Sequence, residues 1–149
     1  MLLTAEEIPI AEIPTPQEDP ERAEEAARFI LKNLYREDNP SARRLREQLT
    51  DMDRRTTIAA FDGDLMVATG SLEIGLPTEA KLEDMAVRDD YKRIGLGSMI
   101  VSRIEAMAAQ AGAEEIRFMS AITSVAFYQK LGYSVHDVIF CQKALRPAD

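Results

Sequence analysis

The sequence predicts a mixed α/β fold in which one layer of mostly antiparallel sheet is covered by helices. Three observations predict it. Apolar residues recur at helical spacing over roughly the first third of the chain. The spacing then changes to a period of two, with "DGD" between two strand-like runs as a hairpin signal. A glycine-containing turn follows, and helical spacing returns after it. The predicted order of elements is β-α-α-β-β-β-α-β-α-β.

The first third of the chain predicts a short edge strand and two helices. The proline-rich start favours a strand over residues 5–10, followed by a turn. Asp19 is a suitable cap for the first helix, with Pro20 at its first position. Asn39 and Pro40 repeat this signature before a shorter second helix.

The middle of the chain predicts three strands. Residues 56–61 and 65–74 form the two arms of the hairpin, and residues 80–87 form the third strand after the turn "GLPT". The helix that follows begins near Leu96 and is expected to end at Gly112.

The last part of the chain predicts strand, helix and strand. These are residues 114–120, 124–131 and 133–145, with Ser124 or Thr123 near the cap of the short helix. No repeat and no flexible linker divides the 149 residues, so we expect a single domain over residues 1–149.

Composition and charge exclude several classes of function. The formal net charge of −8 argues against binding to nucleic acid or to an anionic membrane surface. No apolar stretch reaches the roughly 18 residues needed to span a membrane, and the N-terminus does not resemble a secretory signal. With one cysteine and one histidine, neither a disulfide within the chain nor a Cys/His zinc site is expected, and we predict no metal. These features favour a cytoplasmic protein.

The stretch "YKRIGLGSMI", residues 91–100, is the strongest candidate for a ligand site. Glycine inside a helix is unfavourable, so Gly95 and Gly97 need a reason. A glycine turn before a helix presents free backbone N–H groups to an anion, and Lys92 and Arg93 add positive charge. The spacing fits neither a Walker loop nor a dinucleotide fingerprint. Taken alone, it is equally consistent with a turn that holds no ligand.

Two segments together resemble the GCN5-related N-acetyltransferase (GNAT) family. "LEDMAVRDDYKRIGLGSMIV", residues 82–101, resembles its acyl-CoA-binding signature, and "FYQKLGY", residues 127–133, resembles its second signature. The resemblance extends from about residue 18 onward. This chain departs from the family pattern at Lys92, which replaces Gln or Arg, at Arg93, which replaces a frequent glycine, and at Ala121, which replaces a frequent asparagine.

The resemblance implies acetyl-CoA as acyl donor and a primary amine, on a small molecule or a protein, as acceptor. The backbone of Met85, Ala86 and Val87 would bind the pantetheine arm, and one of the first two N–H groups would polarise the thioester carbonyl. Ser124, or Thr123, would add a polar contact to that arm. The pyrophosphate would lie on the loop formed by Lys92, Arg93, Ile94, Gly95, Leu96, Gly97 and Ser98.

The resemblance also implies two catalytic residues. Tyr128 matches the tyrosine that donates a proton to the departing thiolate, although an aromatic side chain in "VAFYQKLGY" is also consistent with a core position. Glu83 is our first choice for the base that deprotonates the amine, directly or through water. Because Glu83 and Asp84 are adjacent in a strand, we expect their side chains to point to opposite faces. A purely structural carboxylate at residue 83 is equally open.

The acceptor is not defined by the sequence. The arginines between residues 41 and 55 predict a solvated, salt-bridged helix face, and the alternative is a site for an acceptor carrying carboxylate or phosphate. These are Arg43, Arg44, Arg46, Arg54 and Arg55. Two rivals to an acetyltransferase stay open: a transferase for another acyl group, and a non-catalytic acyl-CoA-binding or regulatory module. A homodimer joined through the C-terminal strand is a hypothesis that light scattering can test.

Overall fold

A computed structural model describes residues 4–75, 78–136 and 143 of the chain. The chain divides into two compact units, Met1–Phe118 and Met119–Asp149, each described by itself below. The first unit holds the sheet and three of the helices, and the second holds one short helix. The single domain over residues 1–149 stays a prediction.

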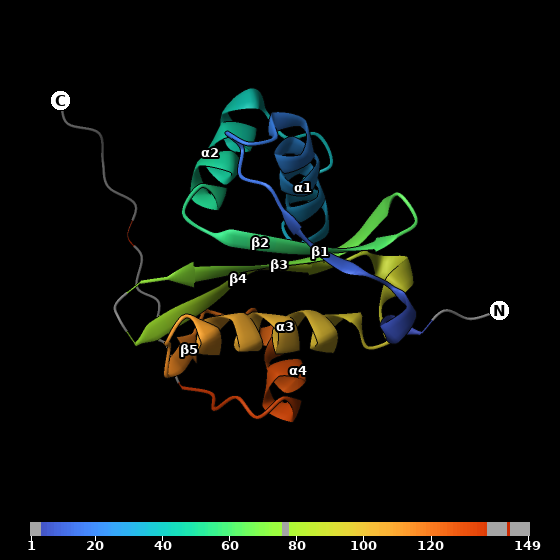
Figure 1. Ribbon diagram of the computed structural model, residues 1–149. Helices are drawn as coiled ribbons and strands as arrows, with labels where there is room; N and C mark the ends of the chain where they lie inside the picture. The colour runs from blue at the N-terminus through green and yellow to red at the C-terminus, as the bar shows by residue number, and fades with distance from the viewer. Residues whose placement is uncertain (1–3, 76–77, 137–142, 144–149) are drawn as a thin grey trace. The chain divides into compact units, whose positions relative to one another are not determined.

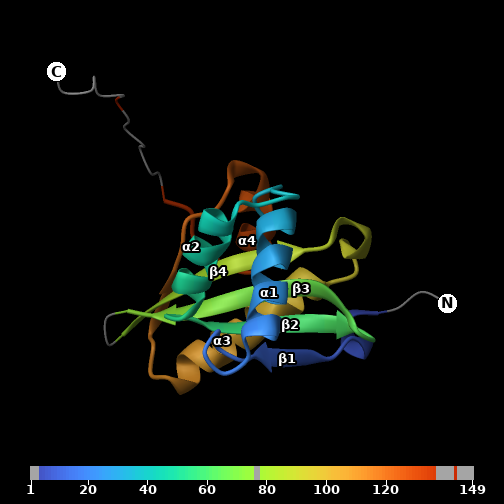
Figure 2. The ribbon, with the colours of Figure 1, turned by 90° about the horizontal axis from the view of Figure 1, so that it is seen from above.

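The first unit is a five-stranded sheet with helices on both faces (Figure 1). Its strands lie in chain order: β1 (Ile10–Ile13), β2 (Thr56–Asp62), β3 (Leu65–Ile74), β4 (Glu79–Val87) and β5 (Glu115–Arg117). The first three pairings are antiparallel and only the last, between β4 and β5, is parallel. Helices α1 (Pro20–Asn33) and α2 (Ala42–Met52) cover one face, and α3 (Leu96–Gln110) covers the other (Figures 1 and 2). The predicted mixed, mostly antiparallel α/β fold is confirmed.

Local side-chain chemistry determines where α1 and α2 begin. The Asp19 carboxylate accepts a hydrogen bond from the Arg22 N–H at 3.1 Å, and Pro20 occupies the first helical position, as predicted. The predicted cap of α2 was wrong by two residues. Ser41 caps this helix, because its hydroxyl accepts the Arg44 N–H at 3.1 Å.

The N-terminal strand also begins later than predicted. A 3₁₀ turn, Ala5–Glu7, occupies the start of the predicted strand over residues 5–10, and β1 begins at Ile10. The turn brings both Ala5 and Ile8 into the interior, where each is almost fully buried. Residues three apart share one side of such a turn, whereas in a strand they would point to opposite faces.

The two faces of the sheet are packed differently. On the α1 and α2 face, the core is built from Ile13, Ala26, Ala27, Ile30, Leu31, Leu45, Met52, Ala59 and Met66. On the other face, α3 lies directly against β3. A Cβ atom built at Gly70 would lie 2.4 Å from Cγ2 of Ile100, so only a residue without a side chain fits there.

The second unit contains a 3₁₀ turn, Ile122–Ser124, followed directly by helix α4, Val125–Lys130. The helix is closed by Gly132 with φ +96°, as the sequence predicts. Residues 133–136 are not in a strand, and most of the strand predicted over 133–145 lies outside the described residues. The predicted strand over 114–120 is shortened to β5.

Candidate functional site

Strand β4 contains a bulge opposite Gly70. In the pairing of β3 with β4, Thr69 lies opposite Ala86 and Ser71 lies opposite Glu83. The single residue Gly70 therefore faces two residues of β4, Asp84 and Met85. Asp84 has φ +54°, in the left-handed region, and such a residue is typical of a strand that carries one extra residue.

The bulge places both carboxylates on the α1 and α2 face. Cross-strand partners share a face of the sheet, and Glu83 is paired with Ser71. Ser71 is paired in turn with Thr57, and Thr57 with Ile13, a member of the core under α1. Asp84 reaches the same helices through side-chain hydrogen bonds. The prediction that the two carboxylates point to opposite faces was wrong, because the extra residue interrupts the alternation.

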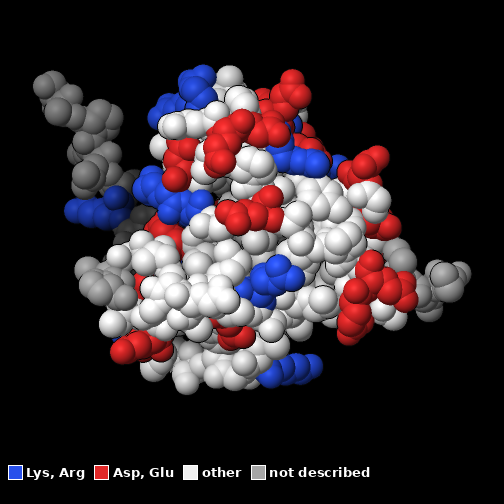
Figure 3. All heavy atoms as spheres, in the orientation of Figure 1, with Lys and Arg blue, Asp and Glu red and all other residues white. Residues whose placement is uncertain are grey.

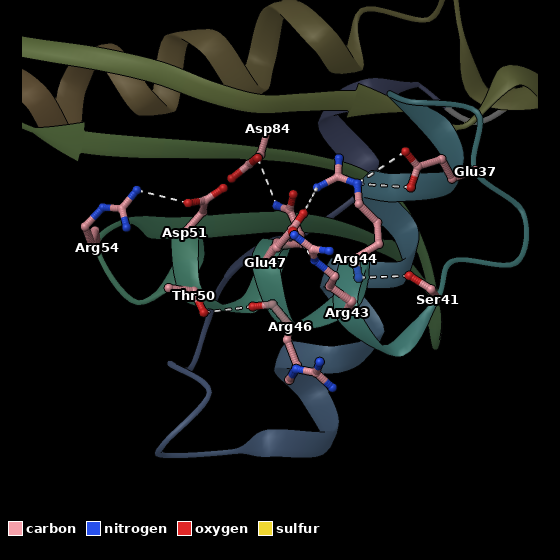
Figure 4. A network of polar contacts seen from close by, with 11 residues as sticks. Glu37, Ser41, Arg43, Arg44, Arg46, Glu47, Thr50, Asp51, Arg54 and Asp84 are labelled. Atoms are coloured by element: carbon pink, nitrogen blue, oxygen red, sulfur yellow. Dashed lines mark hydrogen bonds and ion pairs between the residues drawn. The ribbon is translucent and has the colours of Figure 1, made fainter. Parts of the chain in front are cut away.

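Asp84 is the most deeply buried carboxylate of the site, with 1% of its side chain exposed. Gln48 of α2 donates a hydrogen bond to it at 3.1 Å, and Nη1 of Arg55 contacts both of its oxygens at 3.2 Å. Figure 4 shows Asp84 pointing from β4 toward α2. Its backbone carbonyl accepts a hydrogen bond from the Thr69 hydroxyl at 2.8 Å. Both side chain and backbone are therefore held.

The predicted salt-bridged arginine face is confirmed for Arg43, Arg44 and Arg54, of which Arg44 is partly buried. Ion pairs join Arg43 to Glu47 at 3.3 Å, Arg44 to Glu37 at 3.1 Å and Arg54 to Asp51 at 3.0 Å (Figure 4). On the face shown in Figure 3, acidic and basic side chains are interspersed over this region.

Arg55 is the exception among these arginines. Its side chain is 12% exposed, and it pairs with Glu73 at 3.1 Å as well as with Asp84. It is therefore an interior ion-pair residue and not part of a solvated face.

Glu83 is half-buried and its pKa is raised. Burial is the largest cause, and the charges of Asp84 and Glu73 raise the pKa further, while those of Arg55 and Lys81 lower it. Glu83 takes part in none of the ion pairs found among the described residues. A carboxylate with a raised pKa that is not held in an ion pair is chemically suited to accept a proton.

Tyr35, between α1 and α2, is a neighbour of this cluster that the sequence did not single out. Its ring is stacked under the Arg44 guanidinium, 5.0 Å from the ring centre, and half of the residue is exposed. Its pKa is raised, first by burial and then by the charge of Asp84, with a further contribution from Glu83. An exposed tyrosine in a helix connection gives no sequence signal of its own.

The glycine loop connects β4 to α3. Gly95, with φ +94°, precedes the first residue of α3, and no side chain caps the helix there. The N–H groups of the first helical turn have no partner within a helix. Gly95 is thus required by its backbone angle. Gly97 lies inside the first turn and has no positive φ.

Two anchors hold the loop at its start, a 3₁₀ turn over Asp89–Tyr91. Arg36, from the α1–α2 connection, donates two hydrogen bonds to Asp89 at 3.0 and 3.3 Å, and Lys92 contacts Asp89 at 3.0 Å. These contacts lower the pKa of Asp89 to about 2. The Tyr91 hydroxyl donates a hydrogen bond to Asp62 at the β2–β3 hairpin.

The edge of β4 that faces β5 is paired over a short stretch. In the described part of the chain, β5 pairs with Glu79, Ala80 and Lys81 alone. The predicted pantetheine-binding backbone, Met85–Val87, lies beyond this pairing, between the bulge and the glycine loop. On the β3 side, Ala86 and Val87 remain in register.

The sequence-predicted residues of the second unit lie on or beside α4. Tyr128 is 8% exposed, and burial raises its pKa to about 12. Its ring packs edge to face against Phe127 and Tyr133, with centroid distances of 4.9 and 5.9 Å. Ser124 is the residue before the helix, and its side chain makes no capping hydrogen bond.

Comparison with known proteins assigns the family. The family described as "Acetyltransferase (GNAT) domain" matches residues 18–147, which is most of the chain. The chain belongs to the GNAT acetyltransferase family. A relative in Bacillus subtilis (strain 168), the uncharacterized protein YyaT, is 33% identical over 88 residues. That match covers 59% of each of the two proteins, so the alignment reaches little more than half the length of this curated relative.

Solved acetyltransferases share the fold at low sequence identity. An acetyltransferase from Trypanosoma brucei has a TM-score of 0.70 and 18% identity, covering 92% of this chain and 99% of that one. The aminoglycoside acetyltransferase meta-AAC0020, from an uncultured soil metagenomic sample, was solved in complex with sisomicin. It has a TM-score of 0.74 and 13% identity, covering 93% of this chain and 97% of that one.

One departure of this GNAT chain from the family motif has a structural explanation. Arg93, where the family often has glycine, has φ +70°. The backbone thus keeps the left-handed conformation that glycine adopts freely, although a side chain is present.

The described residues contain neither a metal site nor a membrane-spanning helix. No group of three or more His, Cys, Asp or Glu side chains there could hold a metal ion. No described helix is long and apolar enough to cross a membrane.

Proposed function

We propose that this protein is an acetyl-CoA-dependent N-acetyltransferase that moves an acetyl group to a primary amine by direct attack in a ternary complex. The observation that carries the proposal is the bulge in β4. It directly follows Glu83, a half-buried carboxylate on the face covered by α1 and α2, and it includes the first residue of the backbone predicted to bind the acyl donor. Membership of the GNAT family supports acetyl transfer as the reaction class.

The residues of the glycine loop fit a diphosphate. The first turn of α3 is uncapped, Gly95 leaves its backbone open, and Arg93 and Lys92 supply positive charge at the same loop. The remaining members of the loop, Ile94, Leu96, Gly97 and Ser98, would contribute through their backbone. Acetyl-CoA as substrate would supply the activated acetyl group, and Met85–Val87 would align its pantetheine arm along the stretch of β4 that β5 does not pair.

Glu83 is the proposed base. An amine must lose a proton before its nitrogen can attack a carbonyl carbon, and the raised pKa of Glu83 makes it a stronger proton acceptor than an ordinary glutamate. The proton passes to the carboxylate directly or through one water. The new N–C bond then forms as the C–S bond of the thioester breaks.

Tyr128 is the proposed acid. Its pKa of about 12 means that the phenol is fully protonated at neutral pH, so it can donate to the departing thiolate. Ser124, at the start of the same helix, has a side chain that is not used as a cap, and we propose that it binds the pantetheine arm.

Calorimetric titration with acetyl-CoA, dephospho-CoA and NAD tests the donor site first. We expect micromolar binding of acetyl-CoA and no heat with NAD; absence of binding to all three would refute the assignment of the loop. A panel of primary amines then tests the reaction. Aminoglycosides belong in the panel, because the soil acetyltransferase of similar fold was solved with sisomicin.

Two matched pairs of variants separate an enzyme from a binding module. Glu83→Gln should abolish most turnover while acetyl-CoA binding persists. Glu79→Gln, the control on the same strand, should keep both turnover and acetyl-CoA binding. Tyr128→Phe is compared with Tyr133→Phe in the same way. Tight acetyl-CoA binding with no acetylation of any amine would favour the alternative, a non-catalytic acyl-CoA-binding module.

A further inference from the structure

The interior ion pair between Asp84 and Arg55 has no role in the mechanism above, and it lies next to the proposed base. Asp84 has 1% and Arg55 12% of the side chain exposed. Burying two charges is costly unless both are paired and hydrogen-bonded. Asp84 meets this condition through Arg55 and Gln48, and Arg55 meets it through Asp84 and Glu73. Apolar side chains of similar volume would fill the same space under α2 without the cost of removing two charges from water.

The network acts on the one strained residue of β4. Asp84 has φ +54°, a left-handed conformation that is uncommon inside a strand, although Asp adopts it more readily than most residues with a side chain. Three groups hold it: the Arg55 guanidinium, the Gln48 amide and the Thr69 hydroxyl, which binds the Asp84 carbonyl at 2.8 Å. They come from the α2–β2 connection, from α2 and from β3. Without them, β4 has no local reason to carry an extra residue.

The extra residue decides the face on which Asp84 lies, whereas Glu83 is placed by its regular pairing with Ser71. If β4 continued in regular alternation, consecutive residues would lie on opposite faces. With the bulge, Glu83 and Asp84 lie on the same face, and Arg55 is close enough to act on both charges.

We propose that Asp84 and Arg55 are positioning residues for acetyl transfer: their interior ion pair maintains the bulge of β4, and the bulge turns Asp84 to the face of Glu83, so that the Arg55 cation bound to Asp84 acts on the base. Neither side chain needs to touch a substrate. The proposal rests on Glu83 as the base, as proposed above. It adds the reason why the positive charge of Arg55 partly balances the Glu83 carboxylate.

The pKa of Glu83 depends on every charged group that faces it. Arg55 comes from the α2–β2 connection, Glu73 from β3, Tyr35 from the α1–α2 connection, and Asp84 and Lys81 from β4 itself. Arg55 is the largest of the charge effects on Glu83 and it lowers the pKa, whereas Asp84 raises it. Removing each charge in turn should therefore move the titration of Glu83 in opposite directions.

The test is a ¹³C NMR titration of the Glu83 carboxyl in the full chain without ligands, beside the pH dependence of kcat/KM. Asp84→Asn keeps the shape of the side chain, and Asn is well tolerated at positive φ. We expect it to lower the pKa of Glu83 and to move the acidic limb of the rate profile to lower pH. Arg55→Met should move both to higher pH, and Arg55→Lys should restore most of the shift. Asp84→Asn and Arg55→Lys keep polar groups at these positions and should leave the KM for acetyl-CoA near its wild-type value, whereas Arg55→Met should raise it because the bulge includes Met85.

The outcomes separate this inference from the proposed function. A Glu83 pKa that does not move in Asp84→Asn, or moves in the same direction in Asp84→Asn and Arg55→Met, overturns the positioning role. If Arg55→Met does not fold, Asp84→Asn and Arg55→Lys decide alone. A Glu83 pKa that responds as expected in a protein whose Glu83→Gln variant keeps full activity would instead refute Glu83 as the base.

Discussion

Replacing Gly70 by alanine should destabilise the protein by overfilling the contact between β3 and α3. The new Cβ would lie 2.4 Å from Cγ2 of Ile100, which is roughly 1.1–1.6 Å closer than the ~3.5–4.0 Å at which carbon atoms pack. Ile100 is fully buried in α3, so it has no free space into which it can turn. Overpacking of this kind costs about 1–3 kcal/mol of unfolding free energy.

Urea denaturation followed by circular dichroism measures the effect. Thermal denaturation gives an independent check, because each kcal/mol of lost stability lowers the Tm of a chain of this size by roughly 2–4 °C. The matched background is Ile100→Ala, which removes the Cγ2 atom that the new methyl group would meet. In that background Gly70→Ala should cost almost nothing, because the methyl group fills part of the cavity.

The double-mutant cycle makes the reasoning refutable. A stability change of less than about 0.5 kcal/mol for Gly70→Ala would show that α3 can move away from the sheet without cost. Equal costs of Gly70→Ala in the two backgrounds would show that the destabilisation does not come from Ile100. Either result would also weaken the view that a residue without a side chain is needed opposite the bulge.

Three further predictions concern the glycine loop and α4. Arg93→Gly should be more stable than Arg93→Ala by about 1 kcal/mol in thermal or urea unfolding, because φ +70° strains any residue with a Cβ; the reverse order would contradict the strain. The Tyr128 phenol should ionise near pH 12, so the ultraviolet titration of wild type minus Tyr128→Phe should stay flat to pH 10. Its share of stability should be fully present below pH 10 and be lost progressively as pH rises from 10 through 12. The pKa of Asp89 is depressed to about 2, so its contribution to the free energy of unfolding is present above pH 3.8 and is lost as pH falls through 2. Asp89→Asn should remove this acid dependence from the unfolding free energy. An acid transition that is the same in wild type and variant would contradict it.

The elements that local chemistry determines were predictable from the sequence. Asp19 and Pro20 define the start of α1 through contacts that involve only residues 19–22. The period of two over residues 56–74 likewise predicts the hairpin. The cap of α2 shows the limit of this reasoning, because two plausible caps stood two residues apart and only Ser41 bonds to the helix.

The bulge could not be predicted in the same way. Its partners are distant in sequence: Arg55 lies 29 residues and Gln48 lies 36 residues from Asp84. A weak signal was present in "LEDMAV", where neither alternate set of positions is consistently apolar. A regular strand with one buried face would not give that pattern.

The two anchors of the glycine loop have a consequence for the thermodynamics of binding. A loop that becomes ordered only when it meets a ligand loses conformational entropy at that moment, and the loss reduces affinity. Here Arg36 and Asp62 hold the turn at residues 89–91 from parts of the chain that are 53 and 29 residues away. The entropy of that turn is thus lost during folding of the protein, so a ligand at the adjoining residues 92–98 would not have to order the start of the loop.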